Sequence, residues 1–206
     1  MRSRRSTTNL PQQARQAGVA SRGKAGSPVV WKLTSPSPLH TDRLGRAIGK
    51  ALHGGETLAL LGPLGAGKTS LVRGIAAGLG APPSTVSSPT FVFIHEYHGR
   101  LPFAHVDLYR VHSIREVEST GLEEYLSGET VTAIEWADKG LSLLPQDRLE
   151  IELRHKSVGS RTVQLSSTGL KSTALLADIM RRFARATSHA VTGQLKPPKR
   201  KRHASS

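Results

Sequence analysis

Hydrophobic and polar residues follow two periods along the middle of the chain, one typical of strands and one typical of helices. Apolar or alternating runs of strand length lie at residues 29–33, 56–61, 91–97, 101–107, 131–134, 149–153 and 162–165. Helical spacing covers residues 42–52, with Thr41 as the expected cap, a segment that follows residue 69, and one or two short helices within 112–126. Strands interleaved with helices predict a three-layer α/β fold around a mostly parallel central sheet, with an antiparallel hairpin that turns at 98–100.

The segment Gly62–Thr69 matches the phosphate-binding pattern G-x-x-x-x-G-K-[ST] in full. A strand-like run precedes it and a helical pattern follows it. A loop in this place presents backbone N–H groups and the positive end of a helix dipole to an anion. In such loops the lysine, here Lys68, pairs with the β- and γ-phosphates, and the hydroxyl of Thr69 ligates Mg²⁺. We therefore expect the chain to bind a nucleoside triphosphate.

Two acids are candidates for completing this site. Asp107 ends one predicted strand, and Glu135 directly follows another. Ligands collect at the carboxyl ends of strands in open α/β sheets, so either acid is placed to face the phosphates and hold Mg²⁺ opposite Thr69. The hydroxyl-rich segment 85–90 fits two interpretations, a switch that senses the γ-phosphate or a simple connector.

Several kinds of chemistry are disfavoured by what the sequence lacks. No N-K-x-D guanine-recognition motif occurs, which favours ATP over GTP. The chain has no cysteine, which excludes disulfides, iron–sulfur clusters and thiolate zinc sites. We interpret His95, His98 and His105 as ordinary surface residues, because residues 95 and 98 of one strand point to opposite faces. No apolar run has transmembrane length and no signal segment is recognisable, so we expect a cytoplasmic protein with no membrane partner.

The formal net charge of +14 comes from the two ends of the chain. Residues 1–28 contain six Lys or Arg and no acid, and residues 171–206 contain nine Lys or Arg and one acid, whereas residues 29–170 contain 14 of each. The basic composition therefore describes two extensions rather than the face of a folded domain. Contact with RNA, organellar import through the first segment, and solvated tails without a role are all compatible with it.

These features divide the chain into four segments. Residues 1–28 are expected to be a disordered basic extension, because they contain almost no large apolar residues. Residues 29–168 are expected to form a P-loop domain. Apolar residues on one helical face predict an amphipathic C-terminal helix over 169–188, and residues 189–206 are expected to be a disordered basic tail.

Four segments together are similar to one known family. They are Gly62–Thr69, Ser88–Phe91 (SPTF), His105–Arg110 (HVDLYR) and Ile134–Asp138 (IEWAD). In order and approximate spacing they resemble the bacterial TsaE (YjeE) family, the ATPase component of tRNA threonylcarbamoyladenosine biosynthesis. The resemblance covers residues 29–168. The sequence departs from it at Ala137, where the family often has proline, and in the two basic ends.

The resemblance implies a slow, Mg²⁺-dependent hydrolase of ATP that assists a transferase complex of TsaB and TsaD. That complex transfers the threonylcarbamoyl group to the adenosine beside the tRNA anticodon, and the ATPase does not perform the transfer itself. The implied partners are TsaB- and TsaD-type proteins, with tRNA contacted indirectly or through the basic ends. ATP turnover would reset the complex by coupling the nucleotide state to partner affinity.

The resemblance also implies roles for single residues. Lys68, Asp107 and Glu135 would be catalytic, and the Ser88–Thr90 segment would act as the switch. Thr69 and Glu135 would hold Mg²⁺, with Asp107 contacting it directly or through water; Glu135 would alternatively orient the attacking water. The residues implied to bind the nucleotide are Gly62, Leu64, Gly65, Ala66, Gly67, Lys68, Thr69, Ser70, Thr90, Trp136 and Arg161.

Two other functions are compatible with parts of the sequence. Small-molecule kinases also use a strand, a P-loop and a helix, although the chain after residue 136 offers no arginine-rich lid. An RNA-binding module without enzymatic activity would depend on the basic ends, and its binding would fall steeply with salt.

Overall fold

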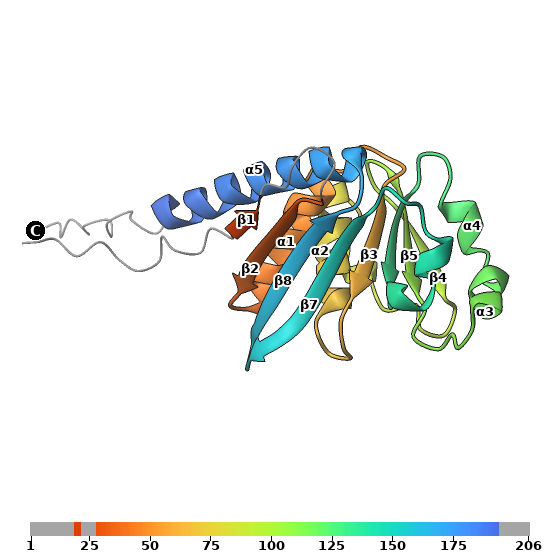
Figure 1. Ribbon diagram of the computed structural model, residues 1–206. Helices are drawn as coiled ribbons and strands as arrows, with labels where there is room; N and C mark the ends of the chain where they lie inside the picture. Colours follow the sequence, from red (N-terminus) through yellow and green to blue (C-terminus); the bar gives the residue numbers. More distant parts are fainter. Residues whose placement is uncertain (1–18, 22–27, 194–206) are drawn as a thin grey trace, which may run out of the picture.

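The computed structural model describes residues 19–21 and 28–193, and the eight strands within them form a single sheet (Figure 1). In order across the sheet, these are β1 (Val19–Ser21), β2 (Val30–Ser35), β8 (Ser160–Ser167), β7 (Leu149–Ser157), β3 (Thr57–Leu61), β6 (Val131–Glu135), β5 (Pro102–Asp107) and β4 (Ile94–His98). Strands β7, β3, β6 and β5 are parallel, and the other neighbouring pairs are antiparallel. The parallel centre and the β4–β5 hairpin are confirmed, and the antiparallel part on the β1 side is larger than predicted.

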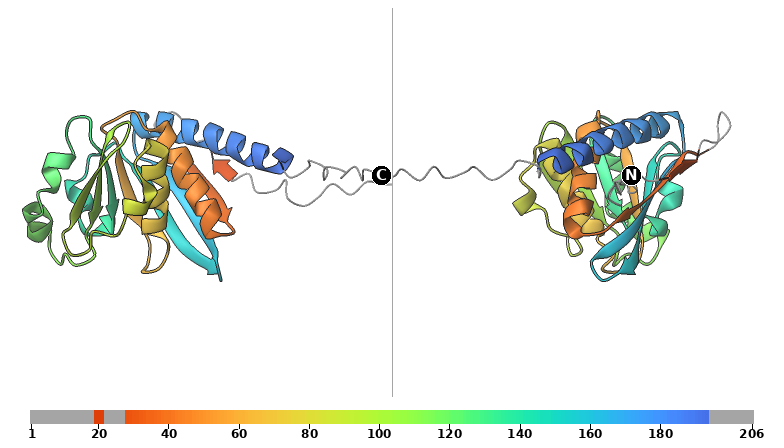
Figure 2. Two further views of the ribbon diagram at one scale, coloured as in Figure 1. Left: turned by 180° about the vertical axis from the view of Figure 1, so that it is seen from behind. Right: turned by 90° about the vertical axis from the view of Figure 1, so that its left-hand side faces the viewer.

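Helices cover both faces of the sheet centre, which confirms the three-layer α/β prediction. They are α1 (Pro38–Ala51), α2 (Lys68–Leu79), α3 (Ile114–Ser119), α4 (Leu122–Tyr125) and α5 (Leu170–Gly193), with the 3₁₀ turns η2 (Pro83–Thr85), η3 (Ala137–Lys139) and η4 (Leu141–Leu143). Helices α1, α2 and α5 share the larger hydrophobic core with one face of the sheet, and α5 runs along α1 (Figure 2). A smaller core on the other face joins β3, β5 and β6 to α3, α4, η3 and η4.

The apolar run of β3 reflects its central position. Leu58 and Leu60 enter the larger core, whereas Ala59 enters the smaller one. Successive side chains of a strand point to opposite faces, so a strand that is apolar throughout needs cover on both sides. The phosphate loop directly follows the carboxyl end of this buried strand.

Helix α1 begins earlier than the sequence pattern predicts. Ser37 is its cap, because the Ser37 Oγ accepts a hydrogen bond from the backbone N–H of His40 at 3.2 Å, and Pro38 suits the first helical position. Thr41, the expected cap, is instead buried within the helix, where its hydroxyl lies 2.7 Å from the Ser35 hydroxyl.

Parts of both basic ends belong to regular structure. Residues 19–21, inside the segment expected to be disordered, form β1 and pair with the edge of β2 through backbone groups, which requires no large apolar side chain. Helix α5 ends at Gly193 rather than at 188. The remaining residues predicted to be disordered, 1–18, 22–27 and 194–206, lie outside the described residues. No helix in the described part of the chain has the length and apolar character needed to cross a membrane.

Helices α1 and α2 touch through their backbones because glycines face each other at two levels. Gly45 lies against Gly74, and Gly49 lies against Gly78. A Cβ built on Gly49 would lie 2.2 Å from the carbonyl oxygen of Ile75 and 2.9 Å from the Gly78 Cα. Main-chain atoms of two packed helices cannot move aside as a flexible side chain can. This contact therefore fixes the position of α2, whose N-terminus carries the phosphate loop.

Gly49→Ala is expected to lower the free energy of unfolding by about 1–3 kcal/mol, the usual cost of overpacking. In an unobstructed helix the same change would stabilise the protein by about 0.5–1 kcal/mol. Lys50→Ala, at an exposed position of the same helix, is the matched control and is expected to stay within about 0.5 kcal/mol of wild type. Urea denaturation measures both variants, and a Gly49→Ala protein as stable as the control would contradict the backbone contact.

Candidate functional site

The pairing of β5 with β6 places two buried acids next to each other. Asp107 and Glu135 are the last residues of these parallel strands and are register partners. Their exposed fractions are 2% and 3%. Asp107 lies on the same face of β5 as Phe103, which packs in the larger core beneath α1 and α2. Both acids therefore lie at the edge of the sheet where the phosphate loop leaves β3.

The Gly62–Thr69 loop connects β3 to α2, as predicted, and its course depends on glycine. Gly62 has φ 128°, and a Cβ there would lie 2.1 Å from the carbonyl oxygen of Leu153. Gly67 has φ 103° and immediately precedes α2. The first N–H groups of a helix have no partner within the helix, so this geometry presents free donors to an anion.

Lys68, near the end of this loop, is buried against the loop residues that precede it. Its Nζ donates hydrogen bonds to the carbonyl oxygens of Gly62 at 2.7 Å and Pro63 at 3.1 Å, and lies 3.8 Å from the centroid of the Trp136 ring. Burial lowers the pKa of the Lys68 ammonium, while the charges of neighbouring carboxylates, chiefly Glu135, act in the opposite direction. A desolvated cation beside a glycine-rich loop is suited to pairing with phosphate oxygens.

Trp136 connects the end of β6 to this lysine. It adopts φ 58°, a left-handed conformation that is uncommon for a residue with a large side chain. Its ring contacts both the Lys68 ammonium and the ring of Tyr109, with 5.0 Å between the Trp136 and Tyr109 ring centroids. The indole is therefore in contact with Lys68, which places Trp136 beside the predicted nucleotide site.

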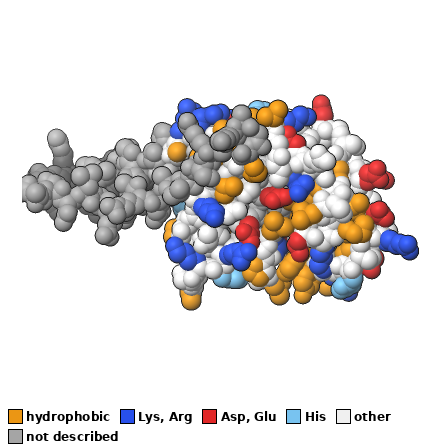
Figure 3. Space-filling view, in the orientation of Figure 1, with side chains coloured by type: hydrophobic (Ala, Val, Ile, Leu, Met, Phe, Trp, Pro, Cys, Tyr) orange, Lys and Arg blue, Asp and Glu red, His pale blue; other side chains and the backbone are white. Residues whose placement is uncertain are grey.

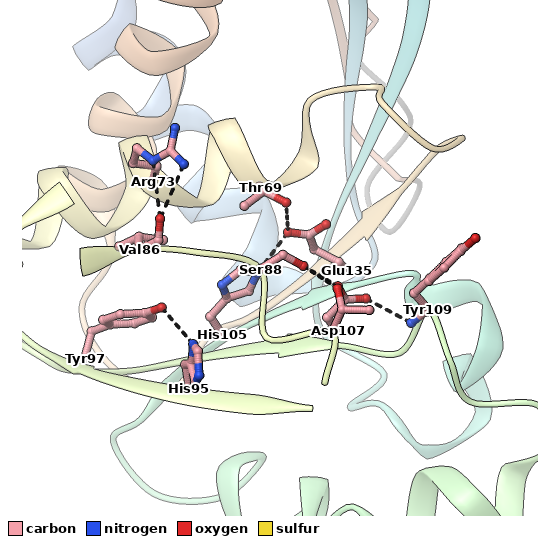
Figure 4. Close-up of polar contacts among 11 residues, drawn as sticks. Thr69, Arg73, Val86, Ser88, His95, Tyr97, His105, Asp107, Tyr109 and Glu135 are labelled. Atoms are coloured by element: carbon pink, nitrogen blue, oxygen red, sulfur yellow. Dashed lines mark hydrogen bonds and ion pairs between the residues drawn. The ribbon is translucent and has the colours of Figure 1, made fainter. Parts of the chain in front are cut away.

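A short hydrogen-bond chain joins the phosphate loop to β6 and β5 (Figure 4). The Thr69 hydroxyl donates to Glu135 Oε1 at 2.7 Å, and the Nε2 of His105 lies 2.9 Å from the same oxygen. His105 is wholly buried, so the prediction that it is an ordinary surface histidine is wrong. The available signal was its spacing, because a residue two positions before Asp107 shares that residue's face of the strand.

Asp107 holds the hydroxyl-rich segment against the sheet (Figure 4). Ser88 Oγ and Thr90 Oγ1 each donate to Asp107 Oδ2 at 2.5 Å, and the backbone N–H of Tyr109 donates to Oδ1 at 2.9 Å. The segment from Ser88 to Thr90 is thus tied to an acid of the site. This contact favours the switch interpretation over a simple connector.

The residues after this segment form a turn instead of the predicted start of a strand. Phe93 has φ 65°, so the extended pairing of β4 begins at Ile94 rather than at 91. Phe91 and Val92 are exposed as a result, at 83% and 58%. The guanidinium of Arg110 lies 5.0 Å from the Phe91 ring centroid. An apolar surface therefore adjoins the segment held by Asp107.

The β7–β8 hairpin reaches the phosphate loop from the other side. Arg161, predicted to contact the nucleotide, donates from Nε to the carbonyl oxygen of Ala66 at 2.9 Å. His155, its register partner on β7, lies with Nε2 3.4 Å from the carbonyl oxygen of Leu64. Both side chains thus contact the loop backbone. The sequence pattern did not indicate His155, because its position depends on the register of the hairpin.

The oxygen atoms at this edge fit a magnesium ion. The Thr69 hydroxyl and a Glu135 carboxylate oxygen lie 2.7 Å apart, and Asp107 ends the neighbouring strand. Magnesium usually takes one or two carboxylates and completes its octahedron with water and substrate phosphates. In the described part of the chain, no group of three or more His, Asp or Glu residues is arranged to hold a metal. Water and phosphate oxygens would therefore supply the remaining ligands of a magnesium ion here.

Comparison with known proteins shows to which family the chain belongs. The model of the family described as "Threonylcarbamoyl adenosine biosynthesis protein TsaE" matches residues 35–163, which include the phosphate loop and both acids. The chain belongs to the TsaE family. It is 37% identical over 135 residues to the "tRNA threonylcarbamoyladenosine biosynthesis protein TsaE" of Treponema pallidum, covering 66% of this chain and 99% of that protein.

Other TsaE relatives agree with this assignment. The Bacillus subtilis protein of the same name is 36% identical over 152 residues, covering 73% of this chain and 93% of the relative. The crystal structure of Bacillus subtilis YdiB superimposes with a TM-score of 0.63 at 30% identity, covering 75% of this chain and 97% of YdiB. The TsaE fold thus accounts for nearly the whole of YdiB, and about a quarter of this chain lies outside the match.

Removing the two hydroxyls that bind Asp107, in Ser88→Ala with Thr90→Ala, is expected to loosen the segment. Each hydrogen bond to a charged group contributes about 1.5–3 kcal/mol. Cleavage by chymotrypsin after Phe91 should therefore accelerate by at least about tenfold, because 1.4 kcal/mol corresponds to a factor of ten. Mass spectrometry of the early fragments measures this rate.

Ser87→Ala is the matched control, because it removes a neighbouring hydroxyl that makes no contact with Asp107. Its cleavage rate should equal that of wild type. Equal rates in the double variant and the control would show that Asp107 does not hold the segment in solution.

Proposed function

We propose that this TsaE-family chain is a Mg²⁺-dependent ATPase that serves threonylcarbamoylation of the adenosine beside the tRNA anticodon. In this proposal it is an accessory of a TsaB–TsaD transferase rather than the transferase itself. The names of its relatives support the pathway. The ATPase activity is proposed because the glycine loop, Lys68 and two buried acids lie together at one edge of the sheet.

In the proposed hydrolysis, each side chain of the site has its own role. Lys68 and the free N–H groups at the start of α2 would hold the phosphates, and Thr69 with Glu135 would hold Mg²⁺. A bound Mg²⁺ would neutralise charge that develops on the phosphate oxygens. Glu135 would serve as ligand or would orient the attacking water, and Asp107 would approach the metal directly or through water.

The Ser88–Thr90 segment would link the nucleotide bound at the site to the position of the exposed residues that follow the segment. Its hydroxyls donate to Asp107, so an arriving γ-phosphate with its metal would compete for both the hydroxyls and the acid. Segments of this kind order or rearrange around the γ-phosphate in P-loop proteins. Phe91 and Val92 directly follow the segment, so their position would depend on the bound nucleotide.

Exposed apolar side chains around the site support a protein partner. Figure 3 shows hydrophobic side chains at the lower edge, where the parallel strands end, and at other places on this face among acidic and basic side chains. Exposed apolar patches are typical of sites of protein–protein contact. The TsaB- and TsaD-type proteins are the proposed partners, and tRNA would be reached through them or through the basic ends. The most exposed large apolar residues near the site are Leu64, Phe91, Val92 and Tyr109.

Lys68→Ala is expected to abolish release of phosphate from ATP and to weaken ATP binding by about tenfold to a hundredfold. The reason is the loss of a charge-assisted contact, which contributes about 1.5–3 kcal/mol. Phosphate release and Trp136 fluorescence, read with ATP and Mg²⁺, measure the two effects. Circular dichroism should show an unchanged fold, because the lysine contacts the loop carbonyls and Trp136 and is not part of the hydrophobic core.

Lys156→Ala serves as the control, since this exposed lysine lies on β7 and bonds only to the Thr34 hydroxyl among the described side-chain contacts. Hydrolysis at the wild-type rate by Lys68→Ala would refute the role assigned to Lys68. Transfer of the γ-phosphate to a small molecule, rather than to water, would support the kinase alternative.

Phe91→Ser is expected to prevent capture of TsaB and TsaD in the presence of ATP while leaving phosphate release at the wild-type rate. Phe91 is 83% exposed, so its removal should not affect the core. Pull-down assays with tagged TsaB and TsaD, with and without ATP, measure the association.

Leu170→Ser removes an equally exposed apolar side chain at the start of α5 and should bind the partners normally. Failure of the wild-type chain to associate under any nucleotide condition would count against the accessory role. Normal capture of Phe91→Ser would place the partner contact elsewhere on the molecule.

A further inference from the structure

His105 occupies a buried position beneath the site that the proposed chemistry leaves without a role. It lies on β5, two residues before Asp107, and has no exposed surface. A buried histidine must satisfy two ring nitrogens, and each nitrogen left without a partner costs free energy. Its Nδ1 is buried and makes no hydrogen bond within the described residues. An apolar side chain would fill this space at lower cost, so packing alone does not explain a histidine here.

The other ring nitrogen makes the one polar contact that the structure gives this side chain. Nε2 lies 2.9 Å from Glu135 Oε1, and both groups are buried. An ionised carboxylate only accepts hydrogen bonds, so Nε2 carries the proton and donates it. The ring is therefore oriented by Glu135, and in turn it holds one oxygen of that carboxylate in place.

The two donors to Glu135 differ in what nucleotide binding would do to them. Thr69 Oγ1 and His105 Nε2 both donate to Oε1, so neither occupies Oε2. The Thr69 hydroxyl belongs to the phosphate loop and would turn toward the metal. His105 is enclosed in the sheet and would keep its hydrogen bond.

We propose that His105 is a positioning residue that orients the Glu135 carboxylate for Mg²⁺ through its hydrogen bond to Oε1. The proposal rests on the Mg²⁺-dependent nucleotide site proposed above. Partners that orient a metal ligand in this way typically contribute ten- to hundredfold to metal affinity. The proposal needs only the hydrogen-bond donor at Nε2.

Two variants separate positioning from packing. His105→Leu fills the space and removes the donor, whereas His105→Gln retains an N–H group at about the reach of Nε2. His95→Leu is the matched control, because it removes the register partner of His105 on β4, whose ring contacts Tyr97 rather than Glu135.

The test measures Mg²⁺ binding without turnover. Each variant is loaded with a non-hydrolysable ATP analogue, and Mg²⁺ is titrated while Trp136 fluorescence is recorded; the other tryptophan, Trp31, packs against Phe183 in the core. His105→Leu should raise the Mg²⁺ midpoint by about tenfold or more. His105→Gln should return it to within a few-fold of wild type. Binding of the analogue without Mg²⁺ should be the same for both variants, and thermal unfolding checks that each variant is folded.

A second measurement tests the inference if the His105→Leu protein does not fold. In a Glu135→Gln background, exchanging His105 for Gln should leave the Mg²⁺ midpoint unchanged, because the group that it positions is gone. A folded His105→Leu protein with the wild-type midpoint would overturn the inference alone. Equal loss of Mg²⁺ binding in His105→Leu and His105→Gln would also overturn it. A wild-type chain with no Mg²⁺-dependent signal would refute the proposed function, and with it this inference.

Discussion

The candidate nucleotide site depends on the parallel pairing of β3, β6 and β5. This pairing sets Asp107 and Glu135 side by side at the edge where the phosphate loop leaves β3. Burying two adjacent carboxylates costs free energy unless each accepts several hydrogen bonds. The structure meets this requirement with different donors for each acid. They are Thr69 and His105 for Glu135, and Ser88, Thr90 and the backbone of Tyr109 for Asp107.

These donors also determine how the site would respond to a ligand. Hydroxyl donors can exchange an acid for a metal or a phosphate, because they lie on the phosphate loop and on the segment that precedes β4. His105 lies inside the sheet and is not exchangeable in this way. Among the side-chain donors, the site thus combines a fixed one, His105, with three hydroxyls that can exchange partners. Since Phe91 follows the segment held by Asp107, the buried acids and the exposed apolar surface are parts of one arrangement.

Most of the fold could be predicted because its signals are local. The apolar run before Gly62, the helical pattern after it and the turn at 98–100 each identified an element from a few neighbouring residues. The start of α1 was also a local signal, the Ser37–Pro38 pair, but Thr41 was chosen in its place. Strand β1 has no such signal, because its pairing is set by the exposed edge of β2. The glycine contact between α1 and α2 likewise depends on how two helices cross.

The sequence by itself determined which functional groups are present: a phosphate loop, two acids at strand ends, and a core whose charges balance while the ends are basic. Tertiary structure decided which groups touch. It buried His105 against Glu135, tied two hydroxyls to Asp107, and brought Arg161 onto the loop backbone rather than into open solution. The physical reason is that these neighbours come from separate elements. Strand register and packing set such distances, and spacing along the chain does not record them.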